Sequence, residues 1–337
     1  MKIGYFIALL LVSLLLGVAG IFFFLFLGPA KSWEEERFIV PLNSREEQTV
    51  TALKEKGFLK SPRIFQLVLE FICWQKKDCP EPGQRIAPGG YLLSKSMNAY
   101  ELAQALAAGP YQKWVLIPPG KRKEQTAVIL QKVLGWSDGI AQGFILAAEE
   151  GYLFPDTYLV DVDADPAEVI SRLRVNFNEK FDAQLQKDLL AQNVRNDTAL
   201  KIASLIERES GGETDKPIIA GIIWNRLNKG MRLEIDATVQ YAMVTEDLKQ
   251  KTTDPDNFNF WPFLPAGVVR KISSLYNTYL HEGLPPGPIC SPGLAAIKAA
   301  VYPAETEAFY YLHSADKQIH TAKTYKEHQE NIEKYLK

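Results

Sequence analysis

The chain begins with an uncharged apolar run, GYFIALLLVSLLLGVAGIFFFLFLG, at residues 4–28. About 25 such residues are enough to span a bilayer with some tilt. Lys2 precedes the run and EEER at 34–37 follows it, a thin asymmetry that favours a cytoplasmic N-terminus. A cleaved signal peptide is the alternative, but its apolar core is shorter, roughly 7 to 15 residues. The pattern therefore predicts an uncleaved single-pass anchor within residues 1–30, with the rest of the chain outside the cytoplasmic (inner) membrane, on the periplasmic side.

Residues 37–117 alternate short apolar stretches with amphipathic ones, a pattern typical of a small α+β domain. Ser61-Pro62 and Asn98 are helix-start signals, and Gly57 is a stop signal. The expected elements run in the order strand, helix, helix, strand, helix, over residues 38–42, 44–56, 61–74, 91–94 and 98–109.

Residues 118–337 form a second, larger predicted α+β domain. Residues 166–193 carry large apolar side chains at near-helical spacing, which predicts one long scaffold helix. Residues 245–270 are polar, Pro-rich and aromatic, and so predict a loop. A solvated loop is the simpler interpretation of this segment, and a lid or a partner contact is the alternative.

Residues 198–241 carry the most informative pattern in the chain. It predicts two helices hinged at Gly211-Gly212, then a loop and the start of a third element. At about 100° per residue, most of residues 199–206 form one broad apolar sector. Glu207 and Glu209 both fall inside that sector, about 160° apart, so they do not form a pair on one face.

A carboxyl held against an apolar wall is costly to ionise, and burial of this kind raises the pKa of a carboxyl. A general acid that works at neutral pH needs such a group. Glu207 and Glu209 are thus both candidates for acid chemistry, and the helical geometry alone does not separate them. The simpler interpretation of Glu209 is a charge at the helix end, held by Arg226 or Lys216.

Composition narrows the class of protein. The 337 residues are 47% hydrophobic and 23% charged with a formal net charge of -2, which suits about two domains with real cores and gives no sign of nucleic-acid binding. The four His and three Cys show neither HExxH nor CxxC spacing, so no metal site is expected. Cys73 and Cys79 are either a small disulfide loop in an oxidising compartment or two free thiols. Cys290 is expected to be a small buried residue.

Three segments together resemble a known family: IASLIERES at 202–210, WNRLNKGMRLEIDATVQYAM at 224–243 and YNTYLHEGLPPGPICSPG at 276–293. They are similar to the endolytic murein transglycosylases of the MltG/YceG type, and the resemblance runs from about Phe38 to the C-terminus. It implies a LysM-like glycan-binding module over 37–117, for which a packing or spacer domain is the alternative, and a catalytic domain over 118–337.

The resemblance also implies a reaction. A bacterial lytic transglycosylase is a carbon–oxygen lyase that cuts the MurNAc–GlcNAc bond of peptidoglycan without water or a cofactor, because the sugar's own C6 hydroxyl attacks and leaves a 1,6-anhydro-MurNAc end. One carboxyl then serves first as acid and later as base, and the motif places it at Glu207. The expected role is termination or trimming of nascent strands during cell wall biogenesis, near peptidoglycan synthases.

Further site residues follow from the same motifs. The resemblance implies seven groove residues that bind the glycan: Asn225, Asp236, Thr238, Gln240, Tyr276, Asn277 and Thr278. Asn225 has an alternative role as a cap at the C-terminus of its helix. Related sequences usually carry Glu where this chain has Pro119, and this departure argues against a site role for the turn at 118–120. The segment at 245–270 is also longer than the resemblance leads us to expect.

Two non-enzymatic hypotheses stand beside catalysis. The chain would be a membrane-anchored, non-catalytic glycan-binding protein if the module at 37–117 did the work, or a membrane-tethered regulator of wall synthesis. Glu207 distinguishes these hypotheses, because a binding module has no reason to bury a carboxylate. An anhydro-sugar product would decide among the three.

Overall fold

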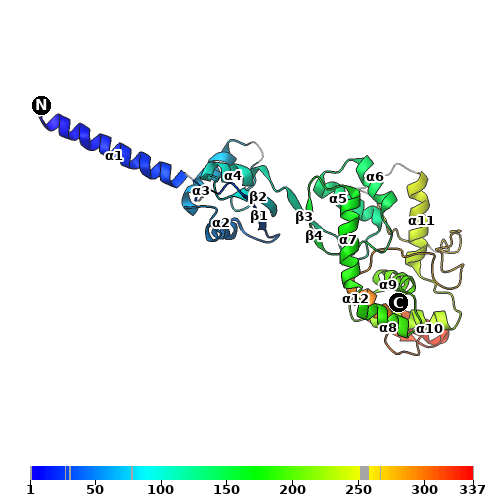
Figure 1. The fold of residues 1–337 in the computed structure, drawn as a ribbon. Helices are drawn as coiled ribbons and strands as arrows, with labels where there is room; N and C mark the ends of the chain where they lie inside the picture. Colours follow the sequence, from blue (N-terminus) through cyan, green and yellow to red (C-terminus); the bar gives the residue numbers. More distant parts are fainter. Residues whose placement is uncertain are drawn as a thin grey trace. The chain divides into compact units, whose positions relative to one another are not determined.

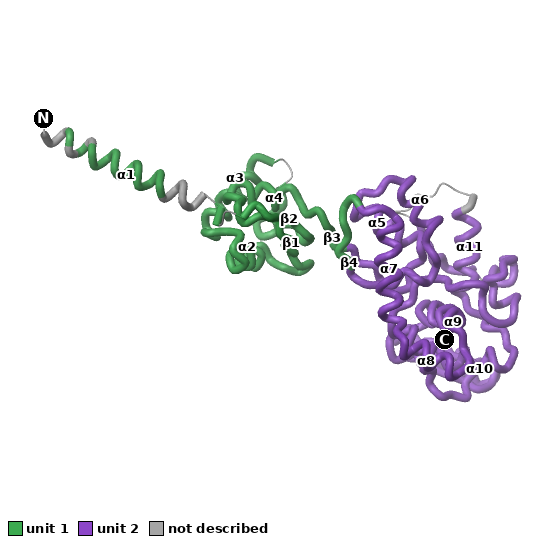
Figure 2. The backbone as a smooth tube through the Cα atoms, in the orientation of Figure 1, with its two compact units in different colours: residues 1–114, 158–163 green, residues 115–157, 164–337 purple. Residues whose placement is uncertain are grey.

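The computed structural model describes residues 2–26, 28–29, 32–76, 79–250, 258–265 and 267–336. The chain is a mixed α+β protein with two compact units, shown in different colours in Figure 2. Unit 1 comprises residues 1–114 and 158–163, and unit 2 comprises residues 115–157 and 164–337. Two separate segments of the chain therefore form unit 1, so a single boundary along the sequence does not divide the two units.

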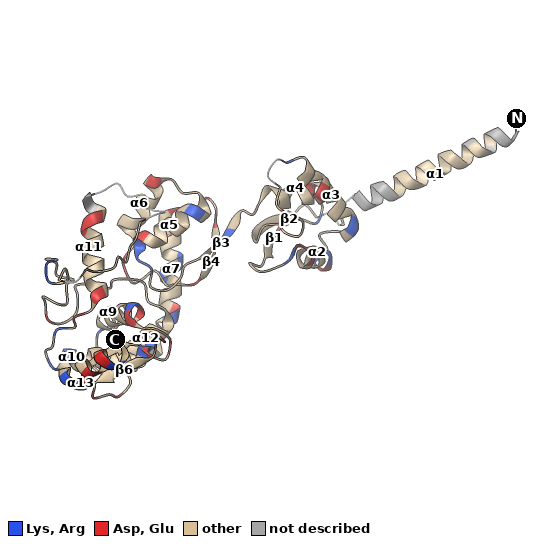
Figure 3. Ribbon diagram, turned by 180° about the vertical axis from the view of Figure 1, so that it is seen from behind, with Lys and Arg blue, Asp and Glu red and all other residues tan. Residues whose placement is uncertain are grey.

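The N-terminal segment forms the helix α1, Lys2–Phe26. Its described part is tan in Figure 3, without the blue or red of charged residues. The predicted span at 4–28 lies partly outside the described residues, since the side chains at 4, 6, 8 and 21–26 and the whole of residue 27 are not described. Within the part that is described, no helix meets the length and hydropathy that a membrane crossing requires.

Unit 1 has the predicted order of strand, helix, helix and strand, followed by a helix (Figure 1). Strands β1 and β2 pair antiparallel with Phe38 opposite Tyr91, and their buried faces pack with the helices around Leu53, Phe65 and Leu69. The elements are β1 Glu35–Val40, α2 Glu46–Glu55, α3 Pro62–Trp74, β2 Gly89–Ser94 and α4 Ala99–Ala108.

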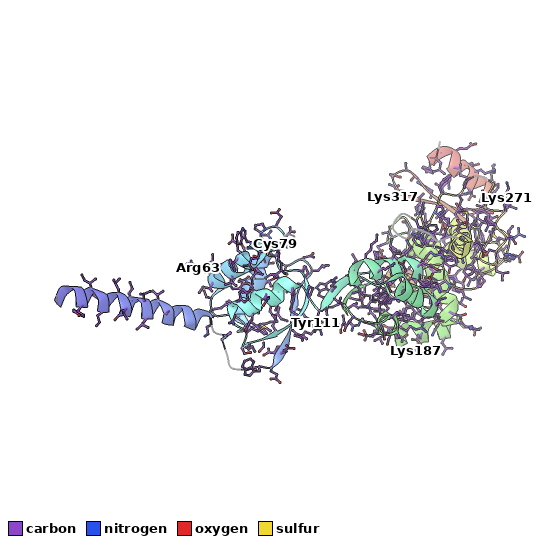
Figure 4. All side chains as sticks on the ribbon, turned by 90° about the horizontal axis from the view of Figure 1, so that it is seen from above. Arg63, Cys79, Tyr111, Lys187, Lys271 and Lys317 are labelled. Atoms are coloured by element: carbon purple, nitrogen blue, oxygen red, sulfur yellow. A yellow bond between two sulfur atoms is a disulfide. The ribbon has the colours of Figure 1, made fainter. Side chains whose placement is uncertain are left out.

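Local signals define the helix ends in unit 1. Ser61 accepts from the N–H of Ile64 at the start of α3, directly before Pro62. Asn98 and Glu101 form a capping box at the start of α4. A disulfide joins Cys73 and Cys79, with 5.2 Å between their Cα atoms, and so ties the end of α3 to the loop that follows; Figure 4 labels Cys79.

The main sheet has four strands in the order β1-β2-β3-β4. β3, Gln112–Leu116, pairs antiparallel with β2, and β4, Thr157–Asp161, lies at the far edge. The division between the two units falls inside β3 and at the first residue of β4. Two helices of unit 2 lie between β3 and β4 in the sequence. The hydrophobic periodicity of a strand does not indicate such a distant pairing, so the sequence pattern did not show that β4 belongs to this sheet.

Unit 2 is built around the helix α9, which packs against α8, α10, α11 and α12 (Figure 1). Its buried residues Ala199, Ile202 and Leu205 are at most 1% exposed and lie in the unit's core. The elements are α5 Lys123–Leu134, α6 Asp138–Ala147, α7 Pro166–Lys180, α8 Ala183–Ala191, α9 Asn196–Glu209, α10 Lys216–Asn228, α11 Asp236–Gln250, α12 Leu294–Val301, β5 Tyr310–His313, β6 Ile319–Ala322 and α13 Tyr325–Tyr335.

The prediction of one long helix over 166–193 is wrong. The helix breaks after Lys180, because Phe181 takes φ -86° and ψ 65° and leaves the helical region. Asp182 then caps α8 by accepting from the N–H of Leu185 at 2.9 Å. The apolar spacing continues through the break, since Phe177, Phe181 and Leu185 all reach the core. Periodicity therefore identified the buried face but not the interruption.

The predicted hinge in the central segment is confirmed. α9 ends at Glu209 and α10 begins at Lys216, with Gly211 and Gly212 between them. After Gly230, which takes φ +68°, a short loop leads into α11, the third element.

Candidate functional site

Glu207 lies in the last turn of α9 with its side chain 9% exposed. Its Oε2 accepts a hydrogen bond of 2.9 Å from the backbone N–H of Gly293, and its Oε1 lies 3.4 Å from Nζ of Lys216. The apolar wall expected from the sequence is thus only part of its surroundings, since one oxygen faces a main-chain donor and the other an ammonium. The arrangement holds both oxygens of the carboxyl group in fixed directions.

The turn at 118–120 lies against Glu207, although its departure from the family motif had argued against a site role. The N–H of Gly120 donates to the carbonyl of Ser291 at 2.9 Å, and the N–H of Ser291 donates to the carbonyl of Lys121 at 2.9 Å. A Cβ atom added at Gly120 would lie 3.7 Å from Cγ of Glu207, and one at Gly293 would lie 3.4 Å from Oε2 of Glu207 and from Cβ of Pro119. Two loops therefore meet at the carboxyl group.

Glu209 points to a different set of neighbours, as the helical geometry predicted. Its Oε2 accepts a 2.7 Å hydrogen bond from the hydroxyl of Tyr311. Burial, with a further contribution from the charge of Asp236, raises the pKa of Glu209. The two partners predicted for Glu209 bind other groups. Lys216 contacts Glu207 and Glu213, and Arg226 donates to main-chain carbonyls.

Lys216, which the sequence offered only as a partner of Glu209, is a site residue beside Glu207. Its side chain is 7% exposed, and its Nζ donates to Oε1 of Glu213 at 2.7 Å in addition to facing Glu207. A cation in the first turn of a helix is disfavoured by the helix dipole. Lys216 at the first position of α10 was therefore a signal of a nearby anion.

Of the seven predicted groove residues, three have buried side chains that bind other parts of the chain. The hydroxyls of Thr238 and Thr278 lie 3.0 Å apart, and Thr278 also accepts from the N–H of Ile235. Asn277 donates to the carbonyls of Val269 and Ile272, each at 2.7 Å. These contacts join the start of α11 to the segment at 269–280, so the three residues brace this wall.

The other four predicted residues are partly or fully exposed. Asp236, at the first position of α11, accepts a 2.7 Å bond from the hydroxyl of Tyr279. The ring of Tyr276 packs against that of Tyr241 at a tilt of 38°, with centroids 4.8 Å apart, and Gln240 donates to the carbonyl of Pro262 at 2.9 Å. These three present polar atoms or a ring face near the surface of unit 2.

Asn225 has the structural role that its sequence alternative anticipated only in part. Its amide donates to the carbonyls of Thr306 and Ala308, at 2.7 and 3.0 Å. It therefore fastens α10 to the segment before β5, rather than capping its own helix. The structure does not test the predicted contact between Asn225 and a glycan, so this contact stays a prediction.

A buried charge cluster lies behind the turn at 118–120. Arg122 is fully buried and donates to Glu124 at 3.0 Å, to the hydroxyl of Thr245 at 2.9 Å and to the carbonyl of Tyr241 at 3.3 Å. Burial raises the pKa of neighbouring Glu150 to about 8, so this carboxyl is largely protonated at neutral pH. The cluster fixes α11 to the start of α5.

The predicted loop insertion contributes one aromatic residue beside the site. The ring of Trp261 lies 4.0 Å from the guanidinium carbon of Arg208, the residue that follows Glu207, and its indole N–H donates to Gln125 at 3.1 Å. Residues 251–257 of the insertion lie outside the described residues. In the described ranges, no group of three or more His, Cys, Asp or Glu side chains is arranged to hold a metal ion.

Comparison with known proteins gives a consistent family. A sequence profile of the YceG-like family matches residues 38–334. The endolytic murein transglycosylase of Bacillus subtilis (strain 168) is 26% identical over 329 residues, covering 88% of this chain and 84% of that protein. The protein of the same name from Streptococcus pneumoniae serotype 2 (strain D39 / NCTC 7466) is 23% identical over 337 residues. That alignment covers 88% of this chain but only 58% of the longer relative.

A solved structure supports the fold. The crystal structure of a yceG-like protein from Listeria monocytogenes aligns with 89% of this chain and 99% of its own, with a TM-score of 0.54 and 24% identity. At this identity the likeness concerns the fold alone.

Proposed function

The chain belongs to the YceG-like family, and we propose on that premise that it is an endolytic lytic transglycosylase that cuts MurNAc–GlcNAc bonds within peptidoglycan strands. The names of the relatives from Bacillus subtilis and Streptococcus pneumoniae support this substrate class. The observation that carries the proposal is the setting of Glu207, a carboxyl group 9% exposed whose described partners are a backbone N–H and an ammonium. Glu209, the adjacent acid of the motif, is bound to Tyr311 instead.

The reaction needs one carboxyl group to act twice. Protonated Glu207 first gives its proton to the glycosidic oxygen, and the bond between that oxygen and C1 of MurNAc breaks. The C6 hydroxyl oxygen of the same MurNAc bonds to C1, and its proton passes to the Glu207 carboxylate. The products are a 1,6-anhydro-MurNAc end and a free GlcNAc hydroxyl, so no water is consumed and the carboxyl group regains its proton.

The surroundings of Glu207 suit both steps. The Gly293 N–H and the Lys216 ammonium stabilise the carboxylate that forms after the first proton transfer. Glycan contacts are assigned to the exposed or partly exposed Asp236, Gln240 and Tyr276, because sugars are bound through hydroxyl partners and ring faces. Thr238, Asn277 and Thr278 act indirectly, by holding the wall on which those contacts sit.

Product analysis tests the proposal directly. The full-length protein in detergent is incubated with uncrosslinked glycan strands, and the fragments are identified by mass spectrometry. We expect internal fragments with 1,6-anhydro-MurNAc ends. Fragments with only reducing ends would mean that a second carboxylate activates water, and would refute the transglycosylase assignment.

Localisation is a separate part of the proposal. The uncharged run at 4–28 supports a single-pass anchor in the cytoplasmic membrane with unit 2 outside, where strand termination beside peptidoglycan synthases would take place. The intact mass of the protein from the membrane fraction tests it. A mature N-terminus near Gly28 would indicate a cleaved signal peptide.

One observation favours glycan binding by unit 1 as an additional or alternative function. A cavity of about 480 Å³ lies beside β1 and α2, lined by residues 38–44 together with Gln48, Thr49 and Ala52. Its mixture of apolar surface and polar side chains suits a LysM-like role for residues 37–117. If the chain binds glycan strands but releases no anhydro ends, the non-catalytic binding or regulatory hypothesis replaces catalysis.

A further inference from the structure

Lys216 is a buried cation shared between two carboxylates of very different exposure. Its own side chain and that of Glu207 are 7% and 9% exposed, whereas the side chain of Glu213 is 74% exposed. The Nζ atom lies 2.7 Å from Oε1 of Glu213, within a charge-assisted hydrogen bond, and 3.4 Å from Oε1 of Glu207, beyond the usual length of one. The ammonium is therefore hydrogen-bonded to the exposed carboxylate and forms a longer ion pair with the buried one.

We propose that Lys216 and Glu213 are positioning residues for the reaction at Glu207, with Glu213 holding the Lys216 ammonium so that Glu207 can enter the reaction with its proton in place. The inference rests on the proposed function of Glu207 and adds a residue pair that controls when this carboxyl group is protonated. Glu213 lies in the turn between α9 and α10 and contacts Lys216 across three positions of the chain.

The physical problem that the pair solves is a conflict between the two steps. An ammonium that paired fully with Glu207 would favour its ionised form and deplete the acid needed for the first step. An uncharged neighbour would leave the carboxylate after that step in a partly buried site without a counter-ion, which is costly. Lys216 is hydrogen-bonded to Glu213, and its Nζ atom lies 3.4 Å from the Glu207 carboxyl group. Its effect on Glu207 is therefore between these two extremes.

The other groups around Glu207 do not replace this pair. From its own helix, the guanidinium of Arg208 is near enough to interact electrostatically with Glu207, but it stacks on Trp261. From the loop before α12, Gly293 supplies an uncharged N–H, and burial raises the pKa of the Cys290 thiol well above its ordinary value, which keeps that thiol neutral. Lys216 is thus the cation from α10 that faces the carboxyl group.

The test is the pH dependence of kcat for strand cleavage by the full-length protein, for the wild type and for Glu213→Gln and Lys216→Met. Glu213→Gln frees the ammonium to pair with Glu207, so we expect the alkaline limb of the profile to move to lower pH by about one unit. Lys216→Met removes the cation, so we expect that limb to move to higher pH while the maximum rate falls roughly tenfold.

A matched control is available on the surface of the same unit. Lys323 and Glu307 form a pair at 2.9 Å with side chains 58% and 83% exposed, so Glu307→Gln also removes one carboxylate from a Lys–Glu pair. Its pH profile should coincide with that of the wild type.

Two results would overturn the inference while leaving the proposed function intact. One is a Glu213→Gln profile with the same limbs as the wild type, whatever the change in maximum rate, since a merely structural role lowers the rate at every pH. The other is movement of the limbs in the same direction in both variants. If Lys216→Met does not fold, Glu213→Gln decides alone, because Glu213 is exposed. An absence of anhydro ends in the wild type would instead refute the proposed function itself.

Discussion

The backbone N–H of Gly293 donates a 2.9 Å hydrogen bond to Oε2 of Glu207, across 86 positions of the chain. The donor belongs to the main chain, at the residue that immediately precedes α12, and α12 packs directly on α9. The orientation of the Glu207 carboxyl group therefore depends on the packing of two helices, as well as on the Lys216 side chain at its other oxygen.

This bond shapes the first prediction, that Glu207→Gln removes strand cleavage. Glutamine keeps an oxygen that can accept from Gly293 but has no transferable proton. Since general acid–base catalysis contributes about a hundred- to ten-thousand-fold and one group serves both steps, we expect the rate of anhydro-end formation to fall by at least about a thousand-fold. Mass spectrometry of digested strands measures it.

The matched control for this variant is Glu209→Gln, in which the amide oxygen can still accept from Tyr311. It should retain most of the activity, and the reverse result would assign the catalytic role to Glu209. Glu207→Gln should also lower the free energy of unfolding, by about 1–2 kcal/mol, because the uncharged amide cannot form the ion pair between residue 207 and Lys216. The pair between Lys216 and Glu213 remains. If the surroundings of Glu207 were entirely apolar, removing its charge would slightly stabilise the fold. We do not expect this result.

A second prediction separates glycan contacts from braces. Asp236→Ala removes an exposed carboxylate, so we expect KM for glycan strands to rise several-fold with a change in stability below about 1 kcal/mol. Asn277→Ala removes the three hydrogen bonds of a buried side chain, so we expect the free energy of unfolding to fall by about 2–3 kcal/mol. Steady-state kinetics and denaturant unfolding together measure both. An unchanged KM in Asp236→Ala would remove this residue from the groove.

A third prediction concerns Glu150, whose pKa burial raises from 4.5 to about 8. Between these values the native state keeps a proton that the unfolded chain has released, so stability falls as pH rises through this window. The slope from one such group is at most about 1.4 kcal/mol per pH unit. Urea unfolding at pH 5 to 8 should therefore show a flatter dependence for Glu150→Gln than for the wild type.

The adjacent Glu149 supplies the control for that experiment, since its side chain is 68% exposed and pairs with Arg174 at the surface. Glu149→Gln should keep the wild-type slope. A Glu150→Gln variant with the wild-type slope as well would mean that Glu150 is ionised in the native state.

The fourth prediction tests the disulfide between Cys73 and Cys79. Alkylation of the denatured, unreduced protein should label one thiol, Cys290, which is the free cysteine and is buried in the native state. Three labelled thiols would contradict the disulfide. In the chain-entropy description a loop of this size contributes about 2 kcal/mol, so the double variant to Ser should lower the stability of unit 1 by that amount.

Several features of this protein follow from the sequence by itself because they depend on neighbours along the chain. The glycines at 211–212 and Pro217 predict that one helix ends and another begins in this segment. The helical repeat predicts that Glu207 and Glu209 point in different directions. In the structure they bind different partners, Gly293 and Tyr311. The motifs at 202–210, 224–243 and 276–293 were sufficient to identify the family.

The tertiary structure decided the rest, because those features depend on groups that are distant in sequence or have no side-chain signature. Periodicity could not detect the break at Phe181, since the buried face continues across it. It could not distinguish the buried braces Asn277 and Thr278 from groove residues, because the same polar side chains suit either role. Nor could it supply the partners of Glu207: one is a main-chain N–H from another loop, and the other is Lys216, which only the packing of α10 on α9 brings to the carboxyl group.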